Sequence, residues 1–272
     1  MDTQALAELQ RSIQSRVEVE DAIRAHAKDL ETACRSLSVP LSRIHVAKTD
    51  EEQDLIQFPN PSPNAYPHLD LQTVIRDTTP LFQPVRDHLQ GISAAFPIAQ
   101  FYRYNHLWSR SVQQAIFAAA LLAYFEHKSL IMPEEIQGYL GVPVKVDNEP
   151  VAMFHLTLEE YLHGIFSLPS ELARFAINSV TYQAYQRPLE ISQFVAGLFS
   201  SFQVLNLKND SIRKHFDSIK LGRRQVRNID VCRYAGAVKP VTGHTQGAGN
   251  VDDGGQPAAM RRAETILLIV GK

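Results

Sequence analysis

The chain has 272 residues, of which 44% are hydrophobic and 21% charged, and this balance excludes an intrinsically disordered protein. Its 27 Lys and Arg nearly balance 29 Asp and Glu, with a net charge of −2, which excludes a uniformly basic nucleic-acid binder. Cys34 and Cys232 have no metal-ligand neighbours, and the acidic N-terminus gives no sign of a signal peptide. We therefore expect an intracellular protein, cytoplasmic and nuclear.

The N-terminal residues up to about Pro40 are predicted to form a long amphipathic helix, because their apolar residues recur mostly every three, four or seven positions. Four prolines between residues 58 and 67 exclude a helix there, so residues 57–68 are predicted to form an inserted loop. A weaker helix pair is expected over 69–89, interrupted at Pro80 and Pro84. The apolar positions of the long helix are Leu6, Leu9, Ile13, Val17, Ile23, Ala27, Leu30, Cys34 and Leu37.

Pro97 suits the first turn of a helix, and we expect one helix from there to about Lys128. Its second half, 115–125, is apolar on every side but too short for a bilayer, which needs about 20 apolar residues. This pattern predicts a buried helix. A shorter helix is expected between Pro133 and Gly141, with proline at its start and glycine at its stop.

Thr157 and Glu160 form a capping-box pattern that predicts another helix start, and Pro169 is expected to kink that helix. Pro188 suits the start of a further helix. Apolar residues then recur every seven positions, which is typical of a heptad seam. Two interpretations stay open: a stripe facing the core of the domain, or a contact between subunits. The seam positions are Ile191, Leu198, Leu205, Ile212 and Ile219.

Together these elements predict an all-α protein, with residues 1–235 as one helical domain and 236–272 as a disordered or divergent tail. The sequence has no phosphate-binding loop, no His-Glu-x-x-His zinc motif and no Gly-x-Ser-x-Gly nucleophile elbow. Glu134, Glu135, Glu159 and Glu160 are interpreted as structural. Glu171 remains a candidate ligand for a catalytic metal, since it lies mid-helix among apolar neighbours.

Two basic segments are candidates for nucleic-acid binding. Residues 101–110 interleave aromatic residues with Arg103, His106 and Arg110, which would share one helix face. Residues 208–233 hold eight Lys and Arg against three Asp, and could be either a solvated face or a phosphate-binding one. Phe101 and Trp108 are expected in the core. The predicted contacts are Arg103, Tyr104, Asn105, His106, Arg110, Lys208, Arg213, Lys214 and Lys220.

Several motifs resemble the translin family. They begin with Phe96-Pro-x-x-Gln-Phe-Tyr-Arg-Tyr and Phe154-His-Leu-x-x-Glu-Glu-Tyr-Leu, and continue with Arg187-Pro-Leu-x-Ile-Ser and Leu205-Asn-Leu-Lys-Asn-Asp-Ser-Ile-Arg-Lys. The resemblance implies an elongated bundle of about seven helices that assembles into a hollow octamer around single-stranded RNA or DNA. With a translin-associated factor X subunit, such a complex processes small RNA, by removing passenger strands in silencing or by acting on tRNA fragments.

The resemblance also implies which subunit this chain is. Where the partner family places four catalytic carboxylates, this chain has Gln114, Phe117, Ser167 and Glu171. One carboxylate does not hold a metal cluster, so we expect a subunit that binds the strand while its partner cuts it. No cofactor is expected, and Mg²⁺ would be needed only by an intrinsic endoribonuclease. That nuclease and a purely structural oligomerisation module are the alternatives. Some translins have a proposed nucleotide-binding segment that contains glycine. The matching residues here, 182–185, contain none, so GTP binding is not expected.

Overall fold

The structure is a computed structural model. It describes residues 3–46, 70–95, 97, 100–145, 153–181 and 186–203, and five single residues after that. The chain divides into two compact units. Unit 1 comprises residues 1–43, 69–119 and 133–164, and unit 2 comprises residues 44–68, 120–132 and 165–272. Within the described ranges, no helix is both long and apolar enough to cross a membrane.

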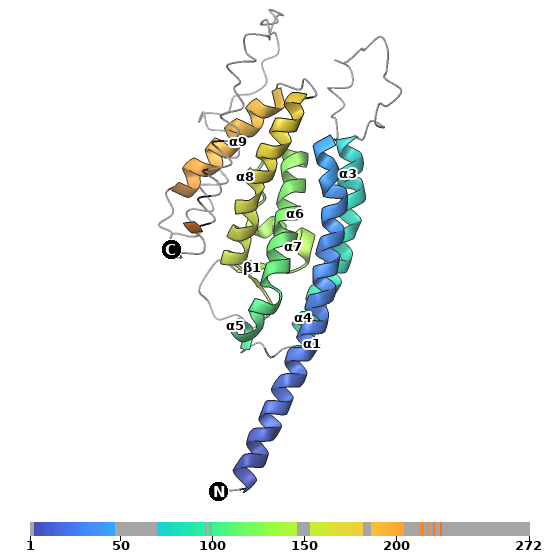
Figure 1. Ribbon diagram of the computed structural model, residues 1–272, viewed down its shortest axis with the longest axis vertical. Helices are drawn as coiled ribbons and strands as arrows, with labels where there is room; N and C mark the ends of the chain where they lie inside the picture. The colour runs from blue at the N-terminus through green and yellow to red at the C-terminus, as the bar shows by residue number, and fades with distance from the viewer. Residues whose placement is uncertain are drawn as a thin grey trace, which may run out of the picture. The chain divides into compact units, whose positions relative to one another are not determined.

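Unit 1 is built around the pairing of its two N-terminal helical stretches. Helix α1 (Thr3–Ser42) lies alongside α3 (Leu71–Thr78) and α4 (Phe82–Ala95), which are joined by the short 3-10 helix η2 (Thr79–Leu81) (Figure 1). The buried residues of each helix recur every three or four positions, so each helix turns one apolar stripe toward the other. These residues are Ile23, Ala27, Leu30, Cys34 and Leu37 on α1, and Phe82, Val85, Leu89 and Ile92 on α4.

The rest of unit 1 contains short elements and the beginnings of two long helices. These are α5 (Phe101–Tyr104), η4 (Asn105–Leu107), the first half of α6 (Ser109–His127), α7 (Pro133–Leu140) and the start of α8 (Leu158–Thr181). Strands β1 (Val144–Lys145) and β2 (Leu156–Thr157) pair in parallel, with Val144 opposite Leu156. Helix α7 ends at Gly141, whose φ of +71° is a left-handed conformation that glycine adopts without strain.

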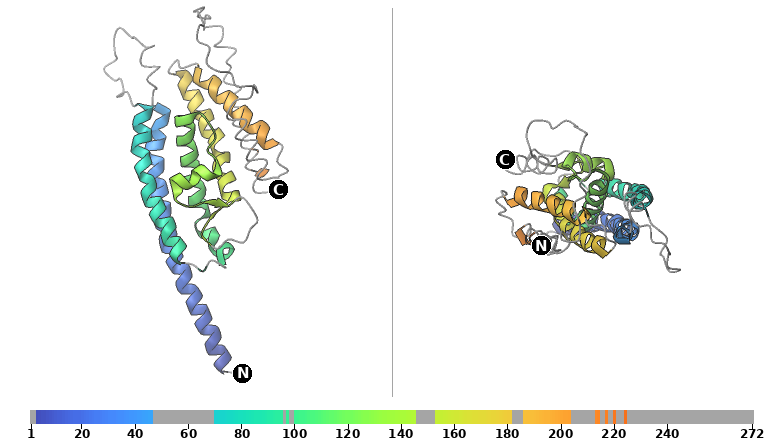
Figure 2. Two further views of the ribbon diagram at one scale, coloured as in Figure 1. Left: turned by 180° about the vertical axis from the view of Figure 1, so that it is seen from behind. Right: turned by 90° about the horizontal axis from the view of Figure 1, so that it is seen from above.

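Unit 2 contains the second halves of α6 and α8, together with α9 (Gln186–Gln203) and most of the 3-10 helix η1 (Arg43–Val46). Aromatic rings join its helices. Phe125 of α6 lies 5.1 Å from Phe175 of α8, and Tyr124 lies 4.6 Å from Phe194 of α9, between ring centroids. Figure 2 shows α8 beside α9, and the edge-on contact between Phe166 and Phe202, at 5.1 Å, joins the same two helices.

The predicted all-α class is confirmed. The described residues form seven α-helices of eight residues or more and the four-residue α5, while β1 and β2 are two residues each. The capping box is confirmed as well: Glu160 Oε2 accepts a hydrogen bond from the Thr157 backbone N–H at 2.9 Å, and Thr157 Oγ1 accepts one from Glu160 N–H at 3.1 Å. The predicted burial of 115–125 also holds except at Phe117, which is partly buried, while the other ten residues are buried.

The predicted end of the first helix near Pro40 is confirmed, since α1 ends at Ser42. Two other predicted boundaries are wrong. Pro84 does not interrupt α4, since it occupies the first turn, where a backbone N–H has no helical acceptor. The single helix expected from Pro97 to Lys128 is divided into α5, η4 and α6. The predicted loop at 57–68 and the tail at 236–272 lie outside the described residues.

Candidate nucleic-acid interface

The first predicted binding segment is divided into three short helical pieces. Tyr104 and Trp108 have φ near −110° (−109° and −116°), which ends the regular α-helix on either side of η4. Phe101, Tyr104 and Trp108 are all buried. The segment therefore takes its shape from three inward-facing aromatic side chains rather than from one continuous helix.

An aromatic cluster in unit 1 holds these inward-facing side chains. The Trp108 ring lies 5.6 Å from Phe101 and 5.4 Å from Phe154, between ring centroids. The His155 ring stacks on Phe101 at 4.2 Å, with 16° between the ring planes. Offset and edge-on ring contacts of this kind each contribute about 0.5–1.5 kcal/mol beyond apolar burial. The cluster thus fixes the backbone that carries the basic residues.

The outward-facing side of this segment carries the predicted cations. Arg103, His106 and Arg110 are exposed, and Asn105 is partly buried. Tyr104 is a correction to the predicted site, because only 3% of its surface is exposed and its ring offers no face to a base in this structure. The Arg103 guanidinium carbon lies 5.8 Å from the centre of the Tyr104 ring, a distance at which a cation–π contact orients the arginine side chain.

Tyr102 is the aromatic residue of this segment that reaches solvent, and it was absent from the predicted contacts. Its side chain is 74% exposed, and its ring meets the Phe101 ring edge-on at 5.2 Å. The spacing of the buried residues could have revealed it. Positions 101, 104 and 108 follow the three-and-four pattern of a helix face, which leaves position 102 on the opposite side.

The second basic segment belongs to unit 2. Arg213, Lys214 and Lys220 are exposed, as is Arg224. The Lys220 ammonium lies 2.7 Å from an Asp217 carboxylate oxygen, so part of its charge is compensated within the segment. Lys208, also predicted to bind nucleic acid, lies outside the described residues. The structure thus places Arg103, His106 and Arg110 in one unit, and the described cations of the later segment in the other.

The start of the heptad seam contributes to the interior of unit 2. Ile191 is 1% exposed and Leu198 is 3% exposed, so both apolar side chains are already covered within the chain. This burial favours the core interpretation for that half of the seam. Leu205, Ile212 and Ile219 lie outside the described residues, and their assignment to a subunit contact stays a prediction.

Glu171 has a defined environment in unit 2. One carboxylate oxygen lies 2.5 Å from His45 Nε2 and 3.9 Å from the Arg174 guanidinium. The hydrogen bond with His45 lowers the pKa of Glu171, against the opposing effect of partial burial. In unit 1, Gln114 donates a hydrogen bond to the Ser38 hydroxyl at 2.8 Å. No group of three or more potential metal ligands occurs among the residues that the structure describes.

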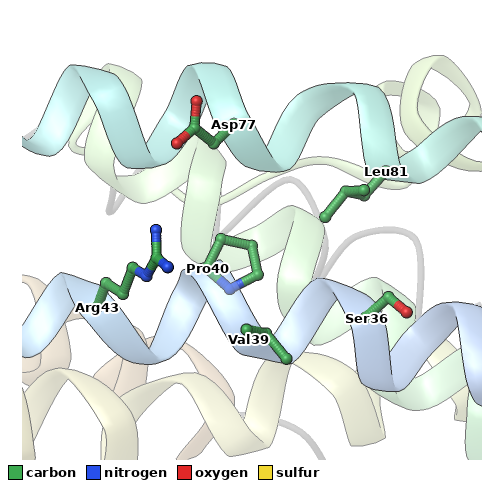
Figure 3. A pocket seen from close by; sticks show the side chains of 6 residues that line it. All are labelled: Ser36, Val39, Pro40, Arg43, Asp77 and Leu81. Carbon is green, nitrogen blue, oxygen red and sulfur yellow. The ribbon is translucent and has the colours of Figure 1, made fainter.

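A shallow groove lies between α1 and α3 in unit 1. Its volume is about 380 Å³. Figure 3 shows Arg43 beside Pro40 on one side of the groove, with its side chain extending toward Asp77 on the other side. The opposite charges make the groove a poor site for a polyanion, so we do not place the nucleic acid here.

Comparison with known proteins identifies the family. The model of the translin family matches residues 18–238. Translin of Mus musculus is 32% identical over 227 residues, which cover 84% of this chain and 90% of that protein. The chain belongs to the translin family.

Other members of the translin family are related over shorter stretches. Translin of Gallus gallus is 40% identical over 148 residues, or 54% of this chain and 63% of that protein. Translin-associated protein X of Mus musculus is 21% identical over 174 residues, or 58% of this chain and 60% of that protein. The crystal structure of apo-NeC3PO has the same fold: its TM-score is 0.52 at 15% identity, and the match covers 84% of this chain and 96% of that chain.

Proposed function

We propose that this chain is the strand-binding subunit of a translin-type oligomer, with single-stranded RNA or DNA as its ligand. The observation that carries the proposal is the pairing of an exposed Tyr102 ring with the exposed Arg103 side chain, on a backbone fixed by the aromatic cluster. An exposed ring stacks on an unpaired base, and an adjacent guanidinium binds phosphate. His106 and Arg110 extend the basic surface.

Membership of the translin family supports an assembly of several subunits. The name of the more distant relative, translin-associated protein X, describes association with translin. We propose a hollow oligomer, an octamer, containing this chain and an X-type subunit, in the cytoplasm and nucleus. Processing of small RNA would then belong to the complex, including passenger-strand removal and RISC activation.

In this proposal, cutting is left to the X-type subunit. Glu171 is the single carboxylate among the four matched positions, and its oxygen already accepts a hydrogen bond from the buried His45. A two-metal nuclease needs several carboxylates around its ions. The chain on its own should therefore leave a labelled RNA intact in the presence of Mg²⁺. Cutting by the purified chain that is lost in Glu171→Gln would instead establish an intrinsic nuclease.

Binding of a labelled oligonucleotide tests the proposed function. We expect the full-length protein to bind single strands with an affinity that falls steeply as salt rises, because each phosphate contact releases a counterion. Arg103→Ala should weaken binding about tenfold or more. It should also reduce the slope of log affinity against log salt concentration by about one, the effect of losing one phosphate contact.

The control is Arg76→Ala, which removes another exposed arginine of unit 1, on α3, that lies 3.9 Å from the Asp77 carboxylate. This variant should bind like wild type. Binding that is insensitive to salt, a preference for duplex, or equal effects of the two substitutions would contradict the proposed function.

A further inference from the structure

His155 reaches the Tyr102–Arg103 surface from a distant part of the chain. It immediately precedes β2, more than 50 positions after α5 in sequence. Its ring is 5% exposed and lies flat on the Phe101 ring. Phe101 in turn is the covalent neighbour of Tyr102 and meets its ring edge-on. The side chain of His155 therefore lies directly behind the exposed residues proposed to meet the strand.

Helix α5 does not hold its own position. It has only four residues, and no side chain caps its N-terminus. A single helical turn is not stable in isolation, because one hydrogen bond does not offset the entropy of ordering its residues. The orientation of Tyr102 and Arg103 thus depends on how firmly Phe101 is held. Among its ring contacts with the described residues, which have centroid distances of 4.2–6.1 Å, the one with His155 is the shortest.

The hydrogen bonding of His155 fixes the tautomer of its neutral ring. Nδ1 lies 3.2 Å from the Met153 carbonyl oxygen, so Nδ1–H donates and Nε2 carries the lone pair. Nε2 is buried and has no hydrogen-bond partner among the described residues. Burial lowers the pKa of His155, the hydrogen bond with the Met153 carbonyl opposes this, and the positive charge of Lys145 on β1 adds a smaller lowering contribution. A second proton would add a buried N–H without an acceptor and a charge near Lys145.

We propose that His155 is a positioning residue of the nucleic-acid surface: its neutral ring, stacked on Phe101 and hydrogen-bonded to Met153, holds Tyr102 and Arg103 where they meet a single strand. The inference deepens the proposed function and rests on it. His155 itself is buried and does not touch the strand. Its contribution to binding is made entirely through the Phe101 stack.

A double-mutant cycle separates positioning from a general loss of stability. The probe is a fluorescein-labelled oligouridine of about 20 nucleotides, long enough to cross several stacking positions. His155→Leu removes both the stack and the hydrogen bond, and should weaken binding about tenfold. In that background, Arg103→Ala should cost much less than it does in wild type, because Arg103 is already misplaced. Lys214→Ala, in the other unit, should cost the same in both backgrounds.

His155→Phe is the conservative variant. Phenylalanine keeps a flat ring on Phe101 while it removes the titrating group, so near neutral pH its affinity should stay within about threefold of wild type. Equal affinity of wild type and a folded His155→Leu, or additive costs in the cycle with Arg103→Ala, would overturn the proposal.

Trp108 gives an independent readout, because it is the chain's one tryptophan and belongs to the same aromatic cluster. Protonation of His155 should change Trp108 fluorescence at a pH below the ordinary histidine value of 6.5. His155→Phe should abolish this transition, while His106→Ala should keep it. A transition that persists in His155→Phe would overturn the proposal even if His155→Leu does not fold.

Absence of strand binding by wild type would overturn the proposed function and this inference together. Binding that depends on Arg103 but not on His155 would overturn the inference alone.

Discussion

The two tyrosines of the binding segment have opposite surroundings. Tyr104 is buried against the cluster, whereas Tyr102 is exposed. The prediction that Phe101 and Trp108 lie in the core is confirmed. The predicted contacts include Tyr104 and not Tyr102, although the spacing of positions 101, 104 and 108 leaves position 102 on the other side of a helix. Phe101 and Trp108, on either side of η4, contact Phe154, and Phe101 also contacts His155. No local pattern reveals these contacts.

Tyr102→Ala should weaken binding of single strands by about 1–3 kcal/mol, the usual contribution of one stacked base. Tyr102→Phe should bind nearly as wild type, since stacking needs the ring and not the hydroxyl. Fluorescence anisotropy with the same oligonucleotide measures both. Equal losses in the two variants would show that the hydroxyl, rather than the ring, makes the contact.

The lowered pKa of Glu171 predicts that the stability of the protein depends on pH. Its pKa is lowered below the ordinary value of 4.5 by the hydrogen bond with His45. A carboxylate with a lowered pKa stabilises the fold above the unfolded-state value, and this contribution is lost as pH falls through the folded-state value. Glu171→Gln should therefore lower the thermal midpoint near neutral pH, with the difference from wild type shrinking below about pH 4.5.

Glu190→Gln is the control for Glu171. Glu190 lies in the same unit, 3.8 Å from the Lys128 ammonium, with about two fifths of its surface exposed (43%). A surface ion pair of this kind contributes little to stability. A Glu171→Gln midpoint that differs from wild type by the same amount at every pH would contradict the assigned role of the His45 hydrogen bond.

At the scale of elements, the helix starts and stops with strong local chemistry were predictable. Pro133 and Gly141 bound α7, and the reciprocal Thr157 and Glu160 hydrogen bonds begin α8, as the sequence indicated. The break that depends on tertiary packing was not predictable: the expected helix from Pro97 to Lys128 is divided into α5, η4 and α6. Pro84 is tolerated because it occupies the first turn of α4.

The crossing of α6 and α8 in unit 1 depends on Gly164. A Cβ atom there would lie 2.6 Å from Ile116 Cγ2 and 3.0 Å from the Gln113 carbonyl oxygen. Gly164→Ala should therefore destabilise the protein by about 1–3 kcal/mol, the usual result of overpacking. Denaturant unfolding measures the change.

Gly197 of α9 is the matched control, because a Cβ atom added there meets nothing within 4 Å. Gly197→Ala should stabilise the protein by up to about 1 kcal/mol through helix propensity. If Gly164→Ala is equally stabilising, the close approach of α6 and α8 is not present in solution.

At the scale of the whole molecule, the all-α translin-family fold followed from the sequence, while the division into two compact units did not. Helices α6 and α8 each contribute to both units, so no linker composition marks the boundary. The predicted extent of the helical domain, 1–235, stays a prediction. The family implies that a single chain is only part of the functional molecule, and the strand-binding surface is proposed to act within the oligomer.

Native mass spectrometry of the full-length protein, alone and with a single-stranded oligonucleotide of about 20 nucleotides, tests the central claim most directly, since it reports assembly and strand binding together. The account predicts a discrete oligomer that gains the mass of bound strand in wild type and Arg76→Ala, and gains far less in Arg103→Ala. A protein that stays monomeric and free of the strand at every salt concentration would contradict it.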